Sequence, residues 1–384
     1  MGDRIRYLRK GEKQQTKPMY EAVFSEDSQR FVDYYYNWKI RDNQIIVMEG
    51  TEEFEGSSLQ VMLHLNPYTV SINRKSQDIS YIVAVATASQ FRRQGKMRQV
   101  MEYTLQDMER REVPFTFLLP ADPVYYSGQG FVFFPCQGLA SVEKDKIVKA
   151  ASAEIYYKNK EHLINRLRWK QAQVQDVSRM ALFSNKILGK RCNIFIKRDC
   201  YYYQRLLVEM EVEHGGILML EAKGQLFGLL TYAFVKQTSC GNTDGSYEES
   251  VSSNKVRAEI KELLLETFLS QKDTETLCRE AFSSIGINNR ELEAVTFSES
   301  QMMVRITDLQ TFVPLLRSER GCSFSVKVRD SIIGSNCGCY GIRLTADGGR
   351  IKKISEKSVQ CKMDIAELTR ELLRDTSVYL NEWV

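Results

Sequence analysis

The chain has 384 residues, which is too long for one ordinary hydrophobic core and predicts two or three domains. Its 43% hydrophobic and 27% charged residues are typical of a soluble globular protein. The net charge of +4 balances 53 basic against 49 acidic residues. We therefore expect no nucleic-acid partner, because a dedicated nucleic-acid binder presents a strongly basic face.

The start of the chain lacks the apolar run of a secretory signal, and no stretch approaches the roughly 18 apolar residues of a membrane span. We therefore expect a cytoplasmic protein with no membrane partner. The nine cysteines are an odd number without a CxxC pair, which argues against a disulfide framework. Because the chain has only His64, His162 and His214 as imidazole ligands, we also expect no metal cofactor.

In chain order, apolar runs predict strands at 44–48, 59–65 and 79–87, and the third is apolar enough to be a central strand covered on both faces. A helix follows, because apolar residues recur at helical spacing over residues 97–108. Another apolar strand is expected at 115–119. Strand, helix and strand in this order form a βαβ unit, whose crossover should be right-handed.

The remaining sequence predicts two further mixed segments. The first has expected helices at 159–170, 201–213, 256–270 and 274–284, a strand pair at 216–221 and 225–236, and a surface loop at 238–254. The second has expected strands at 302–306, 324–328, 338–344 and 359–363, a short helix at 309–316, and a helix marked by Ile365, Leu368, Leu372 and Leu373. The patterns follow one another as α/β, α/β and α+β.

The most informative segment is the start of the helix that follows the third strand. Its first turn and the loop before it contain Gly95 and four basic residues, Arg92, Arg93, Lys96 and Arg98. Unpaired backbone N–H groups and a partial positive charge at a helix start suit a pyrophosphate, and glycine has no Cβ to keep the phosphate oxygens away. The alternative is a solvated basic helix start, which gives no reason for a glycine that costs about 1 kcal/mol in a helix.

This segment, Arg92-x-x-Gly95-x-Met97, resembles the acetyl-CoA-binding motif Arg/Gln-x-x-Gly-x-Gly/Ala of the GNAT acetyltransferase superfamily, with Met97 in place of the small last residue. Longer stretches resemble the Eis (enhanced intracellular survival) branch of that superfamily, in which Met at this position is not unusual. These stretches are His64 to Tyr68, Tyr81 to Thr87, Arg92 to Arg98, Pro114 to Ala121, Tyr126 and Gly130-Phe131.

The resemblance implies an α/β (α+β) fold of three parts: an active GNAT domain at 1–140, a degenerate GNAT-like domain at 141–297 and a sterol-carrier-protein-like domain at 298–384. It implies acetyl-CoA as co-substrate, with no metal. The expected cofactor-binding residues are Val85, Ala86, Thr87, Arg92, Arg93, Gln94, Gly95, Lys96, Met97 and Arg98. Backbone amides around Val85 and Thr87 should hold the pantetheine arm and orient the thioester carbonyl.

By the same resemblance, Tyr126 matches the general acid that acts on the departing thiolate, and the C-terminal carboxylate of Val384 matches the group that helps to deprotonate the amine. An alkylamine with a pKa near 10 must lose a proton before it attacks, whereas a tyrosine is protonated at pH 7 and can donate. Two departures leave alternatives open. Gln129 stands where the family usually has an aromatic residue, and Tyr125 adjoins Tyr126. Either tyrosine could instead be a core aromatic with a satisfied hydroxyl.

For the amine we expect Asp33, Trp38 and Glu382 to supply negative charge and an aromatic face, although aromatic residues in a helix are more often core. The leading prediction is an N-acetyltransferase for the primary amine of a small cationic acceptor, which is aminoglycoside-like, a polyamine or lysine. Protein amines are another acceptor class. The alternative is a non-catalytic carrier of an apolar ligand in the C-terminal domain. By resemblance we expect a homo-oligomer, with a hexamer as the size that the family suggests.

Overall fold

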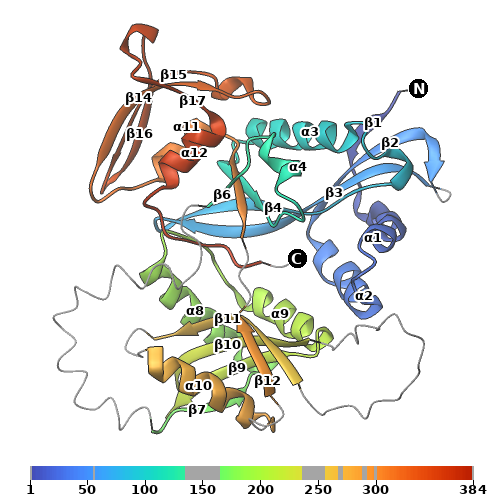
Figure 1. Ribbon diagram of the computed structural model, residues 1–384, viewed down its shortest axis with the longest axis vertical. Coiled ribbons are helices and arrows are strands. Elements are labelled where there is room, and N and C mark those ends of the chain that lie inside the picture. The colour runs from blue at the N-terminus through green and yellow to red at the C-terminus, as the bar shows by residue number, and fades with distance from the viewer. Residues whose placement is uncertain are drawn as a thin grey trace, which may run out of the picture. The chain divides into compact units, whose positions relative to one another are not determined.

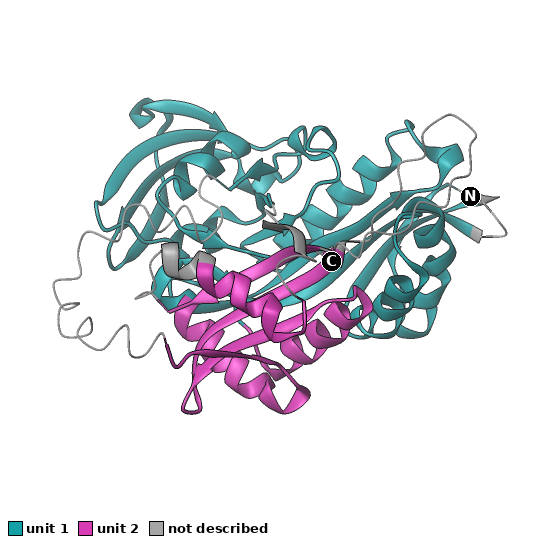
Figure 2. Ribbon diagram, turned by 60° about the horizontal axis from the view of Figure 1, so that its bottom comes forward, with its two compact units in different colours: residues 1–146, 188–197, 300–384 teal, residues 147–187, 198–299 magenta. Residues whose placement is uncertain are grey.

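The computed structural model describes residues 2–54, 57–134, 165–235, 256–266, 271–287, 292–297 and 301–382. Contacts divide the chain into two compact units, one of residues 1–146, 188–197 and 300–384 and the other of residues 147–187 and 198–299 (Figure 2). The first unit contains the segments with the predicted site. The expected domain boundaries after residues 140 and 297 fall in or next to stretches outside the described residues, so the three-domain division stays a prediction.

The first unit is built on a mixed sheet of nine described strands in the order β1-β2-β3-β4-β5-β13-β6, with β8 paired to β3 and β18 paired to β8 (Figure 1). Strands β2 to β4 are an antiparallel meander, whereas β4 and β5 are parallel and are joined through helix α3. The predicted strand–helix–strand unit is thereby confirmed. The strands are β1 (Arg4–Tyr7), β2 (Gln44–Phe54), β3 (Ser57–Ile72), β4 (Lys75–Thr87), β5 (Phe115–Leu118), β6 (Val132–Phe133), β8 (Ile194–Ile196), β13 (Met303–Ile306) and β18 (Val378–Tyr379).

Helices cover both faces of this sheet, as the apolar sequence of β4 predicts. On one face α3 (Lys96–Arg110) packs with Ile46, Leu63 and Ile82 in one hydrophobic cluster. On the other face α1 (Lys17–Val23) and α2 (Gln29–Asn37) form a second cluster that includes Ala84 and Ala86 of β4. Figure 1 shows α3 and the α1–α2 pair on opposite sides of the sheet.

Strand β13 comes from the C-terminal part of the chain but lies inside this sheet, between β5 and β6. It pairs antiparallel with β5 from Met303 opposite Leu118 to Ile306 opposite Phe115, and its first two residues also pair with β6. The C-terminal part therefore completes the sheet that carries the predicted site. Nothing in the local pattern of either strand indicates this pairing.

The rest of the C-terminal part is a four-stranded sheet in the order β16-β15-β14-β17, with two short helices. The predicted strands at 324–328, 338–344 and 359–363 are confirmed, with somewhat different bounds. Helix α12 begins with a capping box in which Asp364 accepts from the Glu367 amide at 2.8 Å. The elements are β14 (Cys322–Arg329), β15 (Gly338–Thr345), β16 (Gly348–Lys353), β17 (Cys361–Asp364), α11 (Leu309–Phe312) and α12 (Ile365–Leu373).

The second unit has a five-stranded sheet in the order β12-β11-β10-β9-β7. Its strands are β7 (Arg168–Gln171), β9 (Gly216–Ala222), β10 (Gln225–Val235), β11 (Val256–Leu265) and β12 (Leu292–Phe297). Its helices are α9 (Cys200–Val212), α10 (Gln271–Ser284) and α8 (Val177–Arg191), whose end from residue 188 belongs to the first unit. The predicted helices at 201–213 and 274–284 and the strand pair around residue 224 are confirmed.

Two predicted helices in this unit are wrong. Residues 168–170 of the expected helix 159–170 belong to β7, and residues 256–265 of the expected helix 256–270 form β11. The remaining parts of these two helices at 159–164 and 267–270, and the expected surface loop at 238–254, lie outside the described residues. In β11 the side chains of Ala258, Ile260, Glu262 and Leu264 are buried in alternation, but a charged Glu262 hides this period in the sequence. Burial of Glu262 is possible because Arg198 donates to its carboxylate at 2.6 Å.

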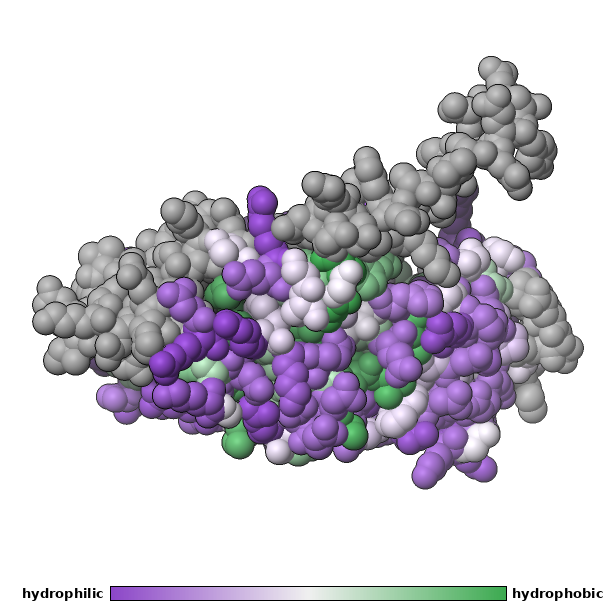
Figure 3. All heavy atoms as spheres, turned by 90° about the horizontal axis from the view of Figure 1, so that it is seen from below, coloured by the Kyte–Doolittle hydropathy of each residue, from purple (hydrophilic) through white to green (hydrophobic). Residues whose placement is uncertain are grey.

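Hydrophilic residues dominate the described surface on the face drawn in Figure 3, and the hydrophobic residues there form small separate patches. Large exposed hydrophobic residues are scattered through the described chain, among them Val124, Val174 and Leu182. Within the described residues, the helices are all too short or too polar to span a membrane.

The packing of α3 generates a stability prediction. Leu105 is fully buried against the sheet, so Leu105→Ala should lower the free energy of unfolding by about 2–5 kcal/mol through lost burial and a residual cavity. Leu182→Ala, at a side chain that is 75% exposed, is the control and should change it by less than about 0.5 kcal/mol. Denaturant unfolding of both variants measures the difference, and equal effects would contradict the assignment of α3 to the core.

Candidate active site

The predicted site lies where β4 and β5 part. The two parallel strands pair only at Tyr81 with Phe117 and at Ile82 with Leu118. β5 ends at Leu118, whereas β4 continues to Thr87. From Val83 onward, the edge of β4 that faces away from β3 therefore pairs with none of the described strands. Backbone N–H and C=O groups along such an edge are available to an extended ligand.

A β-bulge in β4 accounts for this separation. Met62 of β3 lies opposite Ala86 and His64 lies opposite Val83, so Ala84 and Val85 share one partner residue. Ala84 has φ +49, a left-handed conformation that a residue with a side chain rarely adopts. A bulge bends the strand that carries it and increases its twist. The bend thus directs the end of β4 away from the line of β5.

The loop and helix start that follow β4 have the features of a phosphate site. Gly95 is the N-cap of α3 with φ +76, and no side chain caps the first turn. A Cβ built on Gly95 would have no atom within 4 Å, so the backbone conformation rather than crowding inside the protein requires glycine. Residues 92–95 are exposed, and the unpaired N–H groups of the first turn are accessible to an anion.

The four predicted cations differ in how far they are already engaged. Lys96 forms an ion pair with Asp3 and lies over the ring of Phe91, and Arg98 pairs with Glu102 at 2.7 Å. Arg92 donates from Nε to the Thr87 carbonyl oxygen at 3.2 Å, which braces the loop against the end of β4. Arg93 is exposed, makes no hydrogen bond or ion pair with the described residues, and has φ +63. It is the cation with the most freedom to meet a phosphate.

Tyr126 lies on a single helical turn, α4 (Val124–Ser127), that follows the end of β5. Residues 124–130, which comprise α4 and the three residues after it, are called the tyrosine turn below. Its side chain is 7% exposed and packs with Met101 and Leu105 of α3, while its ring meets that of Phe131 edge-on at 6.0 Å. The hydroxyl makes no hydrogen bond within the described part of the chain. Burial, followed by the neighbouring Tyr125, raises the pKa of Tyr126 to about 12. The hydroxyl is therefore protonated at neutral pH and has a proton to donate.

Tyr125 lies on α4 next to Tyr126, and Gln129 follows α4 after one residue. Tyr125 is 59% exposed, so the two adjacent tyrosines point in different directions. Gln129 is buried, donates from Nε2 to the Tyr125 carbonyl oxygen at 2.9 Å, and approaches the sulfur of Met97 to 3.9 Å. Met97 departs from the small last residue of the GNAT motif, and Gln129 stands where the Eis family usually has an aromatic residue. Their contact links the tyrosine turn to the first turn of α3.

The expected acceptor residues are in different surroundings. Asp33 on α2 is exposed and pairs with Lys17 at 2.7 Å, and the guanidinium of Arg41 lies 4.6 Å from the ring centroid of Trp38. Glu382 is buried and accepts a hydrogen bond from the Tyr68 hydroxyl at 2.6 Å. The predicted catalytic carboxylate of Val384 lies outside the described residues.

A polar cluster that we did not predict lies on the α2 side of the sheet, next to the bulge. Tyr35 and His64 are both fully buried, and the Tyr35 hydroxyl lies 3.0 Å from His64 Nδ1. Burial, and then the charge of Lys13, lower the pKa of His64 to about 3, so the ring is neutral. His64 belongs to a stretch that resembles Eis proteins, but nothing in the sequence indicates its partner. Within the described residues, no three Asp, Glu, His or Cys side chains gather as a metal site.

Comparison with known proteins finds a family model that matches the N-terminal part of the chain. Residues 4–134 match the family described as "Acetyltransferase (GNAT) domain". No curated protein matches the chain in sequence. The structure resembles a conserved Enterococcus faecalis protein described as a probable N-acyltransferase (TM-score 0.67, 14% identity, covering 97% of this chain and 89% of that one).

It also resembles a GCN5-related N-acetyltransferase from Anabaena variabilis (TM-score 0.67, 12% identity, covering 99% and 100%) and Eis1 from Mycobacterium abscessus (TM-score 0.59, 10% identity, covering 97% and 89%). At these identities the likeness shows the fold. The chain thus contains a GNAT acetyltransferase domain, and this domain supports an acyltransferase activity.

The environment of Tyr126 generates a prediction about pH. With a folded-state pKa of about 12 against an unfolded value of 10, the folded protein holds this proton over a range in which the unfolded chain releases it. Tyr126 therefore stabilises the folded state fully below pH 10, and this stabilisation is lost as the pH rises from 10 to 12. The phenolate absorbance difference between the wild type and Tyr126→Phe should stay near zero up to about pH 11. A difference signal with its midpoint near pH 10 would contradict the buried placement.

Proposed function

We propose that this chain is an Eis-like N-acetyltransferase that transfers the acetyl group of acetyl-CoA to the primary amine of a small cationic acceptor. The aminoglycoside-like, polyamine and lysine classes are the candidates. The observation that carries the proposal is a convergence in the first unit. One βαβ unit and the turn that follows it contain the open edge of β4, the uncapped start of α3 and the hydroxyl of Tyr126, none of which has a partner among the described residues.

The residues fit acetyl-CoA. In this proposal the pyrophosphate binds the N–H groups at the start of α3, where Gly95 leaves open space and Arg93 is free to add charge. Arg92, Gln94, Lys96, Met97 and Arg98 complete this surface. The pantetheine arm runs along the open edge of β4 and takes the place of a neighbouring strand, with the backbone at Val85, Ala86 and Thr87 as its hydrogen-bonding partner. An N–H group of this edge orients the thioester carbonyl and stabilises the charge that develops on its oxygen.

The attack of the amine on the thioester requires two proton transfers, one to the departing sulfur and one from the amine. Tyr126 acts as general acid towards the sulfur. Because its pKa of about 12 lies above the value near 8.5 of a thiol, donation begins as a hydrogen bond that stabilises the departing thiolate. The amine, with an unperturbed pKa near 10, must lose its own proton, and the C-terminal carboxylate of Val384 assists this step by resemblance. A free carboxylate with an unperturbed pKa near 3.5 is a weak base unless it is partly buried. In this proposal it accepts the proton of the amine by way of a water.

Acceptor recognition rests on negative charge. Glu382 is the strongest candidate, because it is buried and its carboxylate is oriented by Tyr68. Asp33 contributes less charge, since Lys17 already pairs with it, and Trp38 offers an aromatic face that Arg41 partly covers. A small acceptor with several ammonium groups suits such a site better than a neutral amine.

The finer parts of the proposal rest on resemblance. They are the degenerate second GNAT-like domain, the sterol-carrier-protein-like C-terminal domain, the homo-oligomer with a hexamer as its suggested size, and the cytoplasmic location. The carrier alternative, a non-catalytic protein that binds an apolar ligand in the C-terminal domain, gives no reason for an open strand edge, an uncapped helix start and a buried tyrosine in one place. The same features support the enzyme.

A matched pair of glycine variants tests the cofactor site. Gly95 and Gly224 have φ +76 and +77, and a Cβ at either would meet no atom within 4 Å. Gly95→Ala and Gly224→Ala should therefore cost the same stability, about 1 kcal/mol. Only Gly95→Ala should weaken acetyl-CoA binding, by tenfold or more, because its methyl group would occupy the space for phosphate oxygens. Calorimetric titration with acetyl-CoA measures both variants, and equal affinities would contradict the site.

A second experiment tests the reaction. Thiol release from acetyl-CoA is measured with aminoglycosides, polyamines, free lysine and lysine peptides, in the wild type and in Tyr126→Phe. We expect amine-dependent release that falls by about 10²- to 10⁴-fold in Tyr126→Phe. Tyr232→Phe, at a buried tyrosine of the second unit, is the control and should retain full activity. No release with any of the amines, in folded protein that also binds no acetyl-CoA, would instead support the carrier alternative.

A further inference from the structure

A buried arginine, held by an ion pair within the C-terminal part of the chain, connects that part to the tyrosine turn by a hydrogen bond. Arg305 of β13 is fully buried and its Nη2 lies 2.7 Å from Asp330 Oδ1. The same guanidinium donates from Nε to the carbonyl oxygen of Gln129 at 2.9 Å. The backbone N–H of Gln129 in turn donates to the carbonyl oxygen of Tyr126 at 2.9 Å. Arg305 is thus one residue away from the hydrogen bond that closes the turn carrying Tyr126.

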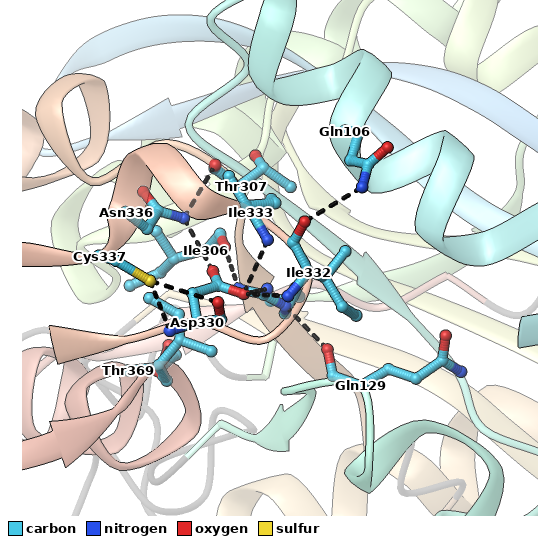
Figure 4. Close-up of polar contacts among 12 residues, drawn as sticks. Gln106, Gln129, Ile306, Thr307, Asp330, Ile332, Ile333, Asn336, Cys337 and Thr369 are labelled. Carbon is cyan, nitrogen blue, oxygen red and sulfur yellow. Dashed lines mark hydrogen bonds and ion pairs between the residues drawn. The ribbon is translucent and has the colours of Figure 1, made fainter. Parts of the chain in front are cut away.

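The hydrogen bonds of Asp330 fix the other end of this contact. Its Oδ1 also accepts from the amides of Ile332 and Ile333, each at 3.0 Å, and its Oδ2 accepts from Asn336 at 3.0 Å (Figure 4). Burial would raise the pKa of Asp330, but the charge of Arg305 and these hydrogen bonds hold it below its usual range. The carboxylate is therefore an anion with defined partners, and it cannot turn without losing several of them.

The loop after Asp330 also contacts the helix that starts at the predicted phosphate site. The carbonyl oxygen of Ile332 accepts from Gln106 Nε2 of α3 at 3.2 Å (Figure 4). Ile332 and Ile333 pack in the same hydrophobic cluster as Tyr126 and Leu105. The loop thus supports the tyrosine turn and α3 at once.

The tyrosine turn is shaped around the guanidinium. Gly130 has φ +84, and a Cβ built on it would lie 2.8 Å from Arg305 Nε and 2.9 Å from Ile365 Cγ2. A residue with a side chain at this position would therefore displace either Arg305 or the turn. Glycine in the sequence motif Gly130-Phe131 is explained by this close approach rather than by a ligand.

We infer that Arg305 is a positioning residue for Tyr126, and that the C-terminal part of the chain thereby contributes to acetyl transfer. The inference rests on the proposed function. A buried ion pair is often replaceable by apolar residues without loss of stability, so stability alone gives little reason for one here. An orienting role explains the ion pair, because a hydrogen bond from a fixed guanidinium defines where the turn that carries Tyr126 lies. A misplacement of a catalytic group by about 1 Å can cost about 10²-fold in rate.

The test compares Arg305→Met with a matched control. Arg198→Met removes the arginine of the buried pair with Glu262 in the second unit, where neither side chain belongs to the proposed site. We expect Arg305→Met to lower kcat by about 10- to 100-fold with KM for acetyl-CoA within twofold of the wild type. Arg198→Met should leave both constants within twofold. An equal loss in both variants would show that general destabilisation is the cause and would overturn the inference.

Two further variants make the test specific to Tyr126. In Tyr126→Phe, which lacks the hydroxyl, adding Arg305→Met should reduce kcat by less than twofold, because there is no acid left to position. A full multiplicative loss would contradict the positioning role. Arg305→Lys keeps the charge opposite Asp330 but lacks the Nε donor to Gln129, so it should be folded and should reproduce the loss of kcat.

A wild-type rate in Tyr126→Phe would reject the acid role in the proposed function, and the inference with it. A normal rate in Arg305→Lys and Arg305→Met, with a slow Tyr126→Phe, would reject the inference alone.

Discussion

The bulge at Ala84 is the constraint on which the rest of the site depends. A regular β4 would continue beside β5, and their backbone groups would satisfy one another. With one extra residue in β4, the pairing stops at Ile82 and five residues of strand are left with an open edge. A left-handed alanine is costly, and such a conformation persists only where its surroundings fix it. Here the pairing of β3 on one side and the packing of Ala84 and Ala86 against α2 supply that support.

The elements around the opening are fixed from three parts of the chain. Helix α3 follows the opened strand after a loop at 88–95, and Arg92 of this loop donates to the carbonyl oxygen of Thr87 at the end of β4. The tyrosine turn follows β5 and is held by Arg305 from the C-terminal part. Tyr35 and His64 occupy the other face of the sheet, where both remain neutral in the folded protein. In the proposed site a contiguous stretch, residues 85–98, supplies the groups that bind acetyl-CoA, and distant segments support the elements around it.

How much of this follows from sequence depends on how local each feature is. The strand β4, the amphipathic helix α3 and its basic start with Gly95 are local patterns, and all were predicted. Burial of Tyr126 beside an exposed Tyr125 could not be decided from spacing, because it depends on packing against α3. The bulge at Ala84, the insertion of β13 and the Arg305–Asp330 pair have no sequence signal, since each arises from contacts between residues far apart in the chain. The wrong helix at 256–270 has a related cause, as a buried charge at Glu262 needs its partner Arg198 to be explained.

The central claim is that acetyl-CoA binds along the open edge of β4 and at the start of α3. Amide hydrogen exchange with and without acetyl-CoA, read at single-residue resolution, tests it most directly. The account predicts slower exchange of the amides at Val85 and Thr87 and in the first turn of α3, residues 96–98, with the amides of the second unit's strands β9 and β10 unchanged. Saturable binding of acetyl-CoA without protection at these amides would contradict it.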